Sequence, residues 1–93
     1  MELNQETAIA IDEAIMAIGA RVENAPRWSG FGFQYLVEGF GVEVQHNFGS
    51  ITVQFSGANT SFVSINDSIV SPQLLARIIV EAVADIKKTI GGN

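Results

Sequence analysis

Few residues of this chain are able to do acid–base chemistry. His46 is the only histidine, and histidine is the residue type that commonly acts as a general base or a metal ligand. A triad can be named from Asp12, Ser29 and His46, but serines are frequent here and the naming has no specificity. With one histidine, no cysteine and no carboxylates at ligand spacing, we expect no metal, no cofactor and no catalytic residue. His46 is expected to be a structural residue of a strand.

Two carboxylates, Glu38 and Glu43, flank the segment Gly39-Phe40-Gly41, which we expect to turn the chain. Carboxylates that approach each other in different environments can share acid–base work. A solvated hairpin end is the commoner arrangement, and nothing else in the chain points to hydrolysis. We therefore expect no enzyme activity and keep Glu38 and Glu43 as acidic contact candidates.

A short segment rich in aromatic residues is a stronger binding candidate. Trp28, Phe31 and Phe33 follow Arg27, in an expected loop over residues 27–32 and at the start of the next strand. Exposed aromatic rings beside an arginine are good interface anchors and good stacking platforms for bases. Alternatively, these rings cap the open end of the hydrophobic core. Both interpretations stay open, and Arg27, Trp28, Phe31 and Phe33 are binding candidates.

Two helices and a sheet must position these residues. Apolar residues at steps of three and four predict a first helix over residues 3–24, in which Gly19 marks a close crossing with another backbone. Alternating apolar and polar residues predict four antiparallel strands, over residues 33–38, 40–48, 51–56 and 61–65. Such strands have one apolar face and one wetter face, and the polar face is either solvated or a binding surface.

The last helix begins at Ser71-Pro72, a good N-cap and first-turn pair, and runs to about residue 90. Leu74 and Val80 lie outside its main apolar stripe, so the helix has more apolar surface than one sheet can cover. We expect the surplus to meet the first helix or another subunit. The binding-surface candidates on this helix are Leu74, Arg77, Val80 and Glu81.

The expected fold is therefore α+β in two layers. An antiparallel sheet of three to four strands carries the N- and C-terminal helices on one face, in the order α-β-β-β-β-α. The 93 residues form a single domain over residues 1–93.

Composition limits the class of partner. The formal net charge is −5, and between Arg27 and Arg77 there is no lysine or arginine, so a sheet built from this segment does not attract phosphates. Cysteine is absent, no apolar run is long enough to span a bilayer, and the first residues lack the basic region of a signal peptide. We expect a cytoplasmic protein with no membrane contact, for which DNA is a disfavoured partner.

The order of features from Ile51 onward resembles the YbaB/EbfC family of nucleoid-associated proteins. Residues 51–58 are similar to that family's second-strand segment with its glycine-containing turn, and residues 75–85 to its final helix. The resemblance covers about half the chain and implies a homodimer of intertwined sheets and helices that contacts DNA. The extra strand content over residues 25–48 and the scarcity of basic residues depart from the family. Of these two implications, we adopt the homodimer more readily than the contact with DNA.

The leading interpretation is a small acidic, non-enzymatic binding protein that acts as a homodimer and has a protein partner. The resemblance suggests one version of this function, nucleoid-associated DNA binding. One alternative is a phage-type anti-defence inhibitor that blocks a basic nucleic-acid-binding partner. Another is a module that holds a small nucleotide or metabolite at the loop from Trp28 to Phe33. Size, acidity and the lack of a catalytic constellation are compatible with all three.

Overall fold

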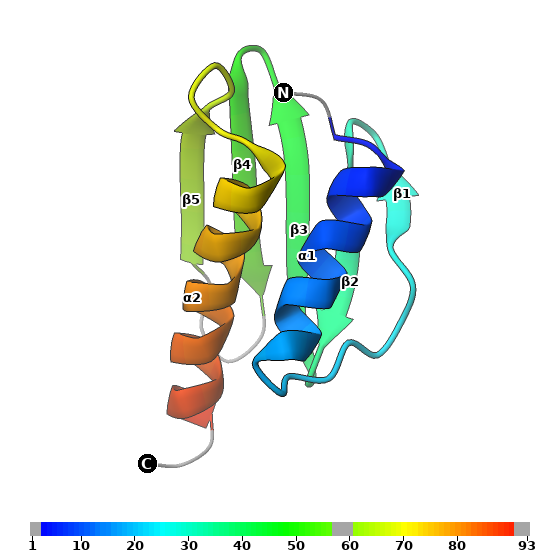
Figure 1. Ribbon diagram of the computed structural model, residues 1–93, viewed down its shortest axis with the longest axis vertical. Coiled ribbons are helices and arrows are strands. Elements are labelled where there is room, and N and C mark those ends of the chain that lie inside the picture. The colour runs from blue at the N-terminus through cyan, green and yellow to red at the C-terminus, as the bar shows by residue number, and fades with distance from the viewer. Residues whose placement is uncertain (1–2, 57–60, 91–93) are drawn as a thin grey trace.

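A five-stranded antiparallel sheet forms one layer of the protein (Figure 1). The computed structural model describes residues 3–56 and 61–90. Strand order follows the sequence, β1-β2-β3-β4-β5, so the sheet is a simple meander. In chain order the elements are α1 (Gln5–Ala17), β1 (Arg27–Ser29), β2 (Gly32–Val37), β3 (Phe40–Asn47), β4 (Ser50–Ser56), β5 (Ser61–Asn66) and α2 (Pro72–Ile90).

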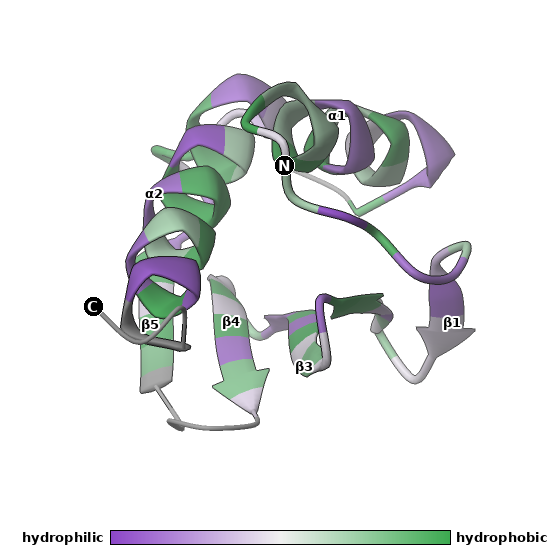
Figure 2. Ribbon diagram, turned by 90° about the horizontal axis from the view of Figure 1, so that it is seen from below, coloured by the Kyte–Doolittle hydropathy of each residue, from purple (hydrophilic) through white to green (hydrophobic). Residues whose placement is uncertain are grey.

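Both helices lie on the same face of this sheet, as the view along the layers shows (Figure 2). α1 lies over the β2–β3 side, α2 lies over the β4–β5 side, and the two helices also pack against each other. The expected two-layer α+β fold is confirmed. No helix within residues 3–56 and 61–90 is long and apolar enough to cross a membrane.

The strand register places the apolar residues in rows beneath the helices. Phe33 pairs with Val44 and Val44 with Val53, while Tyr35 pairs with Val42, and all of them are fully buried. Because side chains alternate between the two faces, a slip of one residue would turn every one of these rows to water. The opposite face presents polar residues to solvent, among them Gln34, Glu43, Gln45, Thr52 and Gln54.

α1 is shorter than the sequence predicts. Asn4 caps its start by accepting a hydrogen bond from the Thr7 backbone N–H at 3.0 Å, and the helix ends at Ala17 rather than at residue 24. Gly19, at φ +83°, reverses the backbone there, which is the usual role of a glycine after a helix end. A Cβ added at Gly19 would meet nothing within 4 Å, so the expected close crossing is also wrong.

The residues beyond Gly19 extend along β2 instead. The Glu23 N–H donates to the Leu36 carbonyl oxygen at 2.7 Å, and the Glu38 N–H donates to Arg21 O at 3.1 Å. These bonds flank a bridge between Val22 and Val37. Apolar Val22 fits the helical stripe, but here it packs beside the sheet.

The segment expected as a loop over residues 27–32 contains a short strand. Arg27 pairs with Gln34 and Trp28 with Phe33, which adds β1 at the edge and makes the sheet larger than the expected three to four strands. Three residues are too few to show an alternating pattern, so no strand could be predicted here.

Two side chains attach the helices to the sheet. The buried hydroxyl of Tyr35 donates to the carbonyl oxygen of Ala8 in α1, and burial, with Asp12 as a smaller cause, raises the pKa of Tyr35. At the other helix, Lys87 Nζ donates to Gly19 O at 3.2 Å and lies 3.3 Å from Glu38 Oε2.

α2 begins as expected, with Ser71 Oγ accepting a hydrogen bond from the Leu74 N–H at 3.1 Å. Leu75, Ile79 and Val83 are fully buried against the sheet. Val80 is half-buried and packs against the core, so it accounts for part of the apolar surplus within the protomer. Leu74 stays 37% exposed.

Candidate binding surface at the turn end of the sheet

Three connections of the meander lie at one end of the sheet, because the chain reverses direction at every strand. They are the β1–β2 turn, the β3–β4 turn and the β5–α2 connection. Each carries one large apolar side chain in water: Phe31 is 76% exposed, Phe48 is fully exposed and Ile69 is 71% exposed. We call Phe31, Phe48 and Ile69, with the residues that connect them, the turn end.

Phe48 occupies an unfavourable backbone position. It forms the β3–β4 turn with Gly49, and both residues have positive φ, +40° and +83°, as a two-residue hairpin turn of type I′ requires. Asn and Gly prefer such positions, whereas a bulky residue there is strained at a cost of order 1 kcal/mol or more. The fully exposed ring gains nothing from the core in return.

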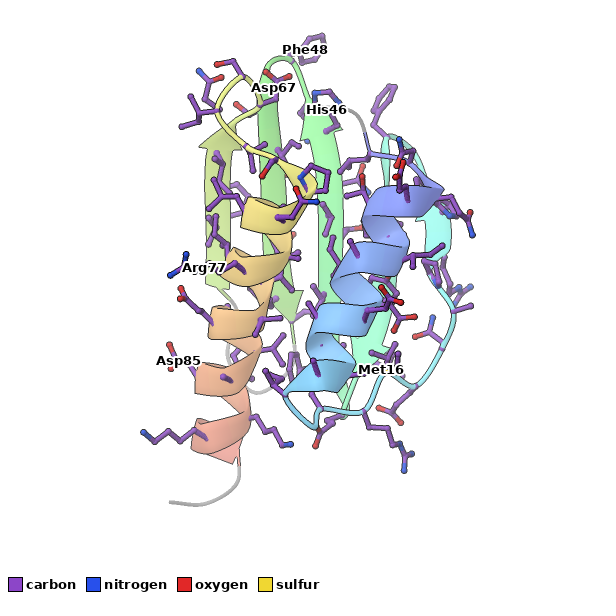
Figure 3. The ribbon with its side chains drawn as sticks, viewed as in Figure 1. Met16, His46, Phe48, Asp67, Arg77 and Asp85 are labelled. Atoms are coloured by element: carbon purple, nitrogen blue, oxygen red, sulfur yellow. The ribbon has the colours of Figure 1, made fainter. Side chains whose placement is uncertain are left out.

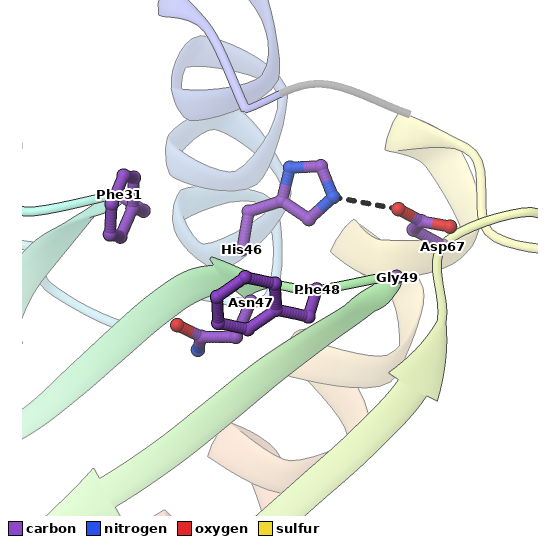
Figure 4. A pocket seen from close by; sticks show the side chains of 6 residues that line it. All are labelled: Phe31, His46, Asn47, Phe48, Gly49 and Asp67. Atoms are coloured by element: carbon purple, nitrogen blue, oxygen red, sulfur yellow. Dashed lines mark hydrogen bonds and ion pairs between the residues drawn. The ribbon is translucent and has the colours of Figure 1, made fainter.

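His46 joins the three connections. Its ring Nε2 lies 2.7 Å from Asp67 Oδ2 in the β5–α2 connection, and its backbone N–H donates to Phe31 O at 3.2 Å (Figure 4). Asp67 in turn donates its backbone N–H to Gly49 O at 2.8 Å. Because the carboxylate accepts, we assign the ring proton to Nε2. His46 and Asp67 therefore link the backbones of the three connections that carry the apolar tips.

A glutamine on the polar face supports the first of these turns. Gln45 Oε1 accepts from the Phe31 N–H, and Gln45 Nε2 donates to Ser29 O, both at 3.2 Å. Gly32 follows the turn where β2 runs close to β3, and a Cβ there would lie 1.7 Å from Val44 O. Phe31 is thus exposed on a turn whose backbone is held on both sides.

Shallow hollows lie between these side chains. One, of about 380 Å³, is lined by Phe31, His46, Asn47, Phe48, Gly49 and Asp67 (Figure 4). A second, of about 310 Å³, is lined by Leu3, Trp28, Gly30, Phe31, Gly32 and His46. Both volumes are at the lower limit of small-molecule sites.

The aromatic candidates separate in the structure. Trp28 packs edge-to-face on Phe33, with ring centroids 5.0 Å apart, and keeps 46% of its surface exposed. Phe33 is fully buried and belongs to the core, while Phe31 belongs to the turn end. Arg27 is exposed at the edge strand opposite Gln34. The core interpretation therefore holds for Phe33, while Trp28, Phe31 and Arg27 stay binding candidates.

The acidic candidates do not meet. Glu43 lies on the polar sheet face opposite Gln34 and Gln54, whereas Glu38 lies in the β2–β3 turn, at the end of the sheet opposite the turn end. Glu38 accepts the Arg21 N–H at 3.1 Å, and this bond and Lys87 lower the pKa of Glu38. The alternative in which the two carboxylates share acid–base work gains no support, because Glu38 forms an ion pair with Lys87 instead.

The α2 candidates lie apart from the turn end. Arg77 and Glu81 form an exposed ion pair at 3.8 Å, and Arg77 projects from the side of α2 that faces away from α1 (Figure 3). Exposed pairs of this kind contribute little to stability.

The structure does not assemble the nominal triad. The carboxylate beside His46 is Asp67 and not Asp12, and Ser29 bonds Gln45 through its backbone. Within residues 3–56 and 61–90 no group of three His, Cys, Asp or Glu side chains is placed to hold a metal ion. Sequence reasoning missed Phe48, Asp67 and Ile69.

Comparisons with known proteins identify no relative: no family model matches the chain, and no curated protein or solved structure matches it. The resemblance to the YbaB/EbfC family stays a prediction.

Proposed function

We propose that this chain is a non-enzymatic binding protein that recognises a partner protein through the turn end. The observation that carries the proposal is the presence of Phe31, Phe48 and Ile69 at the tips of three neighbouring connections, all largely exposed. A rigid scaffold that displays apolar loop tips is a common arrangement for recognition.

The energetics of association favour this surface. Burial of a Phe or Ile side chain on binding contributes roughly 1.5–3 kcal/mol, and aromatic residues are frequent interface hot spots. The bonds from His46 to Phe31 and Asp67 hold the backbone of these connections, so less backbone conformational entropy is lost on binding. Strain retained at Phe48 is consistent with selection for binding rather than for stability.

Charge favours a protein over a nucleic acid as the partner. Three of the five basic residues, Arg21, Arg77 and Lys87, lie within 4 Å of carboxylates, at 3.6, 3.8 and 3.3 Å. Phosphate binding needs basic side chains that can release counterions, and paired arginines and lysines on a chain of net charge −5 supply little of this. The inhibitor hypothesis is compatible with this surface, but Glu38 lies at the other end of the sheet and pairs with Lys87.

A small-molecule site is the second candidate function. The hollows on either side of Phe31 and His46 favour it, since they combine aromatic walls with hydrogen-bonding groups. A nucleotide or metabolite bound there would change the fluorescence of Trp28, which lines one hollow. Titration with a panel of nucleotides, followed by Trp28 fluorescence, distinguishes this candidate from protein binding. The Trp28→Phe variant is the control, because it lacks the fluorophore.

We further propose that the protein acts as a homodimer in the cytoplasm. The exposed Leu74 supports self-association, whereas Val80 is accommodated within one protomer.

Affinity capture with matched variants tests the proposed function. We expect the wild-type chain to retain a specific protein from its native host, and Phe31→Ser and Phe48→Ser each to lose it. Leu36→Ser is the control, because Leu36 is similarly apolar and 43% exposed but lies in β2 near the opposite end of the sheet. Direct titration of the purified partner should rank the affinities of the wild-type chain and the variants in the same order. Equal retention by all four proteins would exclude the turn end as the binding surface.

A further inference from the structure

The outer edge of β5 is the feature that leads furthest beyond the turn end. β5 is the last strand of the sheet, and no other described strand pairs with its outer side. An edge strand presents unpaired backbone donors and acceptors that can bind another strand.

The alternation of hydrogen-bonded and non-hydrogen-bonded pairs along the strands shows which backbone groups of β5 face outward. Asn47 and Ser50 close the two-residue β3–β4 turn, so they form a hydrogen-bonded pair, and such pairs alternate along antiparallel strands. On β4 the backbone N–H and C=O groups directed at β5 therefore belong to Ile51 and Val53. The hydrogen bond from the Asp67 N–H to Gly49 O follows the same alternation. It follows that Phe62 and Ser64 direct their N–H and C=O groups to the outside.

β5 lacks the devices that usually protect an edge. Residues 61–66 contain no lysine, no proline and no charged residue. Phe62, which is 64% exposed, projects from the polar sheet face at this edge. The other edge, β1, has only three residues and begins with Arg27, so it is a much poorer template.

We propose that β5 pairs antiparallel with β5 of a second copy of this chain, joining two sheets into one of ten strands. The inference rests on the proposed homodimer and specifies its surface. A strand paired with itself about a two-fold axis uses both long edges and closes the assembly, whereas β5 on β1 would leave edges free for further growth. Each copy has net charge −5, and the uncharged edge brings the copies together without placing like charges opposite each other.

The size of the contact predicts its strength. A six-residue strand is about 20 Å long, so the pair is at the small end of protein interfaces, below about 1,200 Å². We expect a dimer that forms at micromolar concentration and dissociates on dilution. Pairing centred on Ser64 places Phe62 beside Asn66 of the second copy and covers part of its exposed ring.

Sedimentation of the full chain over a range of micromolar concentrations tests the proposal. We expect Ser64→Pro to raise the dissociation constant about tenfold or more, because proline removes an outward donor from the pairing edge. Phe62→Glu should act in the same direction, and Leu36→Glu, on the same face but away from β5, should not. Phe48→Ser should leave the dimer intact, and Ser64→Pro should still bind the turn-end partner.

Amide hydrogen exchange of the wild-type chain gives a second readout that needs no variant. The amides of Phe62 and Ser64 should become protected as concentration rises, while that of Trp28 on the β1 edge should not. A dimer in which the Ser64 amide stays unprotected would overturn the β5 pairing and leave the homodimer standing. A monomer at every concentration would overturn both, without bearing on partner binding by the turn end.

Discussion

The imidazole Nε2 of His46 lies 2.7 Å from Asp67 Oδ2, and this contact joins the end of β3 to the connection between β5 and α2. The two residues are 21 positions apart in sequence, and both side chains are partly buried. Since the His46 backbone N–H also donates to Phe31 O, His46 contacts both of the neighbouring connections.

Replacing His46 should loosen the turn end without unfolding the sheet. We expect His46→Ala to lower the free energy of unfolding by about 1 kcal/mol, the usual value of one hydrogen bond, and to weaken partner binding. Urea denaturation and the binding assay measure the two effects. Gln54→Ala is the control, because Gln54 is exposed on the polar face of β4, away from the turn end. Equal losses in both variants would show that the His46–Asp67 contact has no special role.

Phe48 should show a conflict between stability and binding. Phe48→Asn supplies the Asn-Gly pair that type I′ turns prefer, so we expect the free energy of unfolding to rise by about 0.5–1 kcal/mol. The same change removes an exposed ring and should weaken partner binding. Phe31→Asn has no such backbone benefit and serves as the comparison. A loss of stability in Phe48→Asn would contradict the strain assigned to this turn.

Gly32 should be the glycine that tolerates substitution least. A Cβ at this position would lie 1.7 Å from the backbone oxygen of Val44, and a strand cannot yield by that much without losing its pairing. We expect Gly32→Ala to destabilise the fold by more than about 3 kcal/mol. Gly19→Ala, which has open space but a positive φ, should cost only about 1 kcal/mol. Thermal unfolding of the two variants gives the comparison, and the reverse order would refute the register of β2 on β3.

Asp12 should make stability depend on pH. Burial, with the neighbouring Glu13 as a second cause, raises the pKa of Asp12 above its ordinary value of 3.8. A raised pKa means that folding disfavours the charged form, so the penalty is full above the folded-state pKa and is relieved as pH falls through it. Asp12→Asn should therefore be more stable than the wild-type chain at pH 7, by up to about 1 kcal/mol.

Denaturation curves over a pH series test this sign. The difference between the two proteins should close as pH falls toward 3.8. Glu6→Gln, in the first turn of the same helix, removes a carboxylate that the helix dipole favours and should not stabilise. An Asp12→Asn protein less stable at pH 7 would show that the carboxylate is stabilising.

Much of the fold could be predicted because alternation is a local signal. The run from Phe40 to Phe55 placed two strands and their buried face correctly, and Ser71-Pro72 placed the start of α2. The end of α1 could not be predicted the same way, since Val22 fits a helical stripe equally well and only Gly19 distinguishes the two outcomes.

The candidate site was less accessible to sequence reasoning. Phe31 was singled out for its type, but Asp67 meets His46 only through the meander, which brings alternate connections to one end of the sheet. Phe48-Gly49 was a usable signal, because a bulky residue in a two-residue turn is unusual. Assigning strand parity first would have grouped Phe31, Phe48 and Ile69.

The direction of α2 has a practical consequence for any immobilised assay. Its axis runs away from the turn end, and 19 helical residues span about 28 Å (Figure 1). An affinity tag fused after α2 would therefore attach the molecule to a support at the end opposite Phe31 and Phe48, and both aromatic rings would stay exposed to the solution.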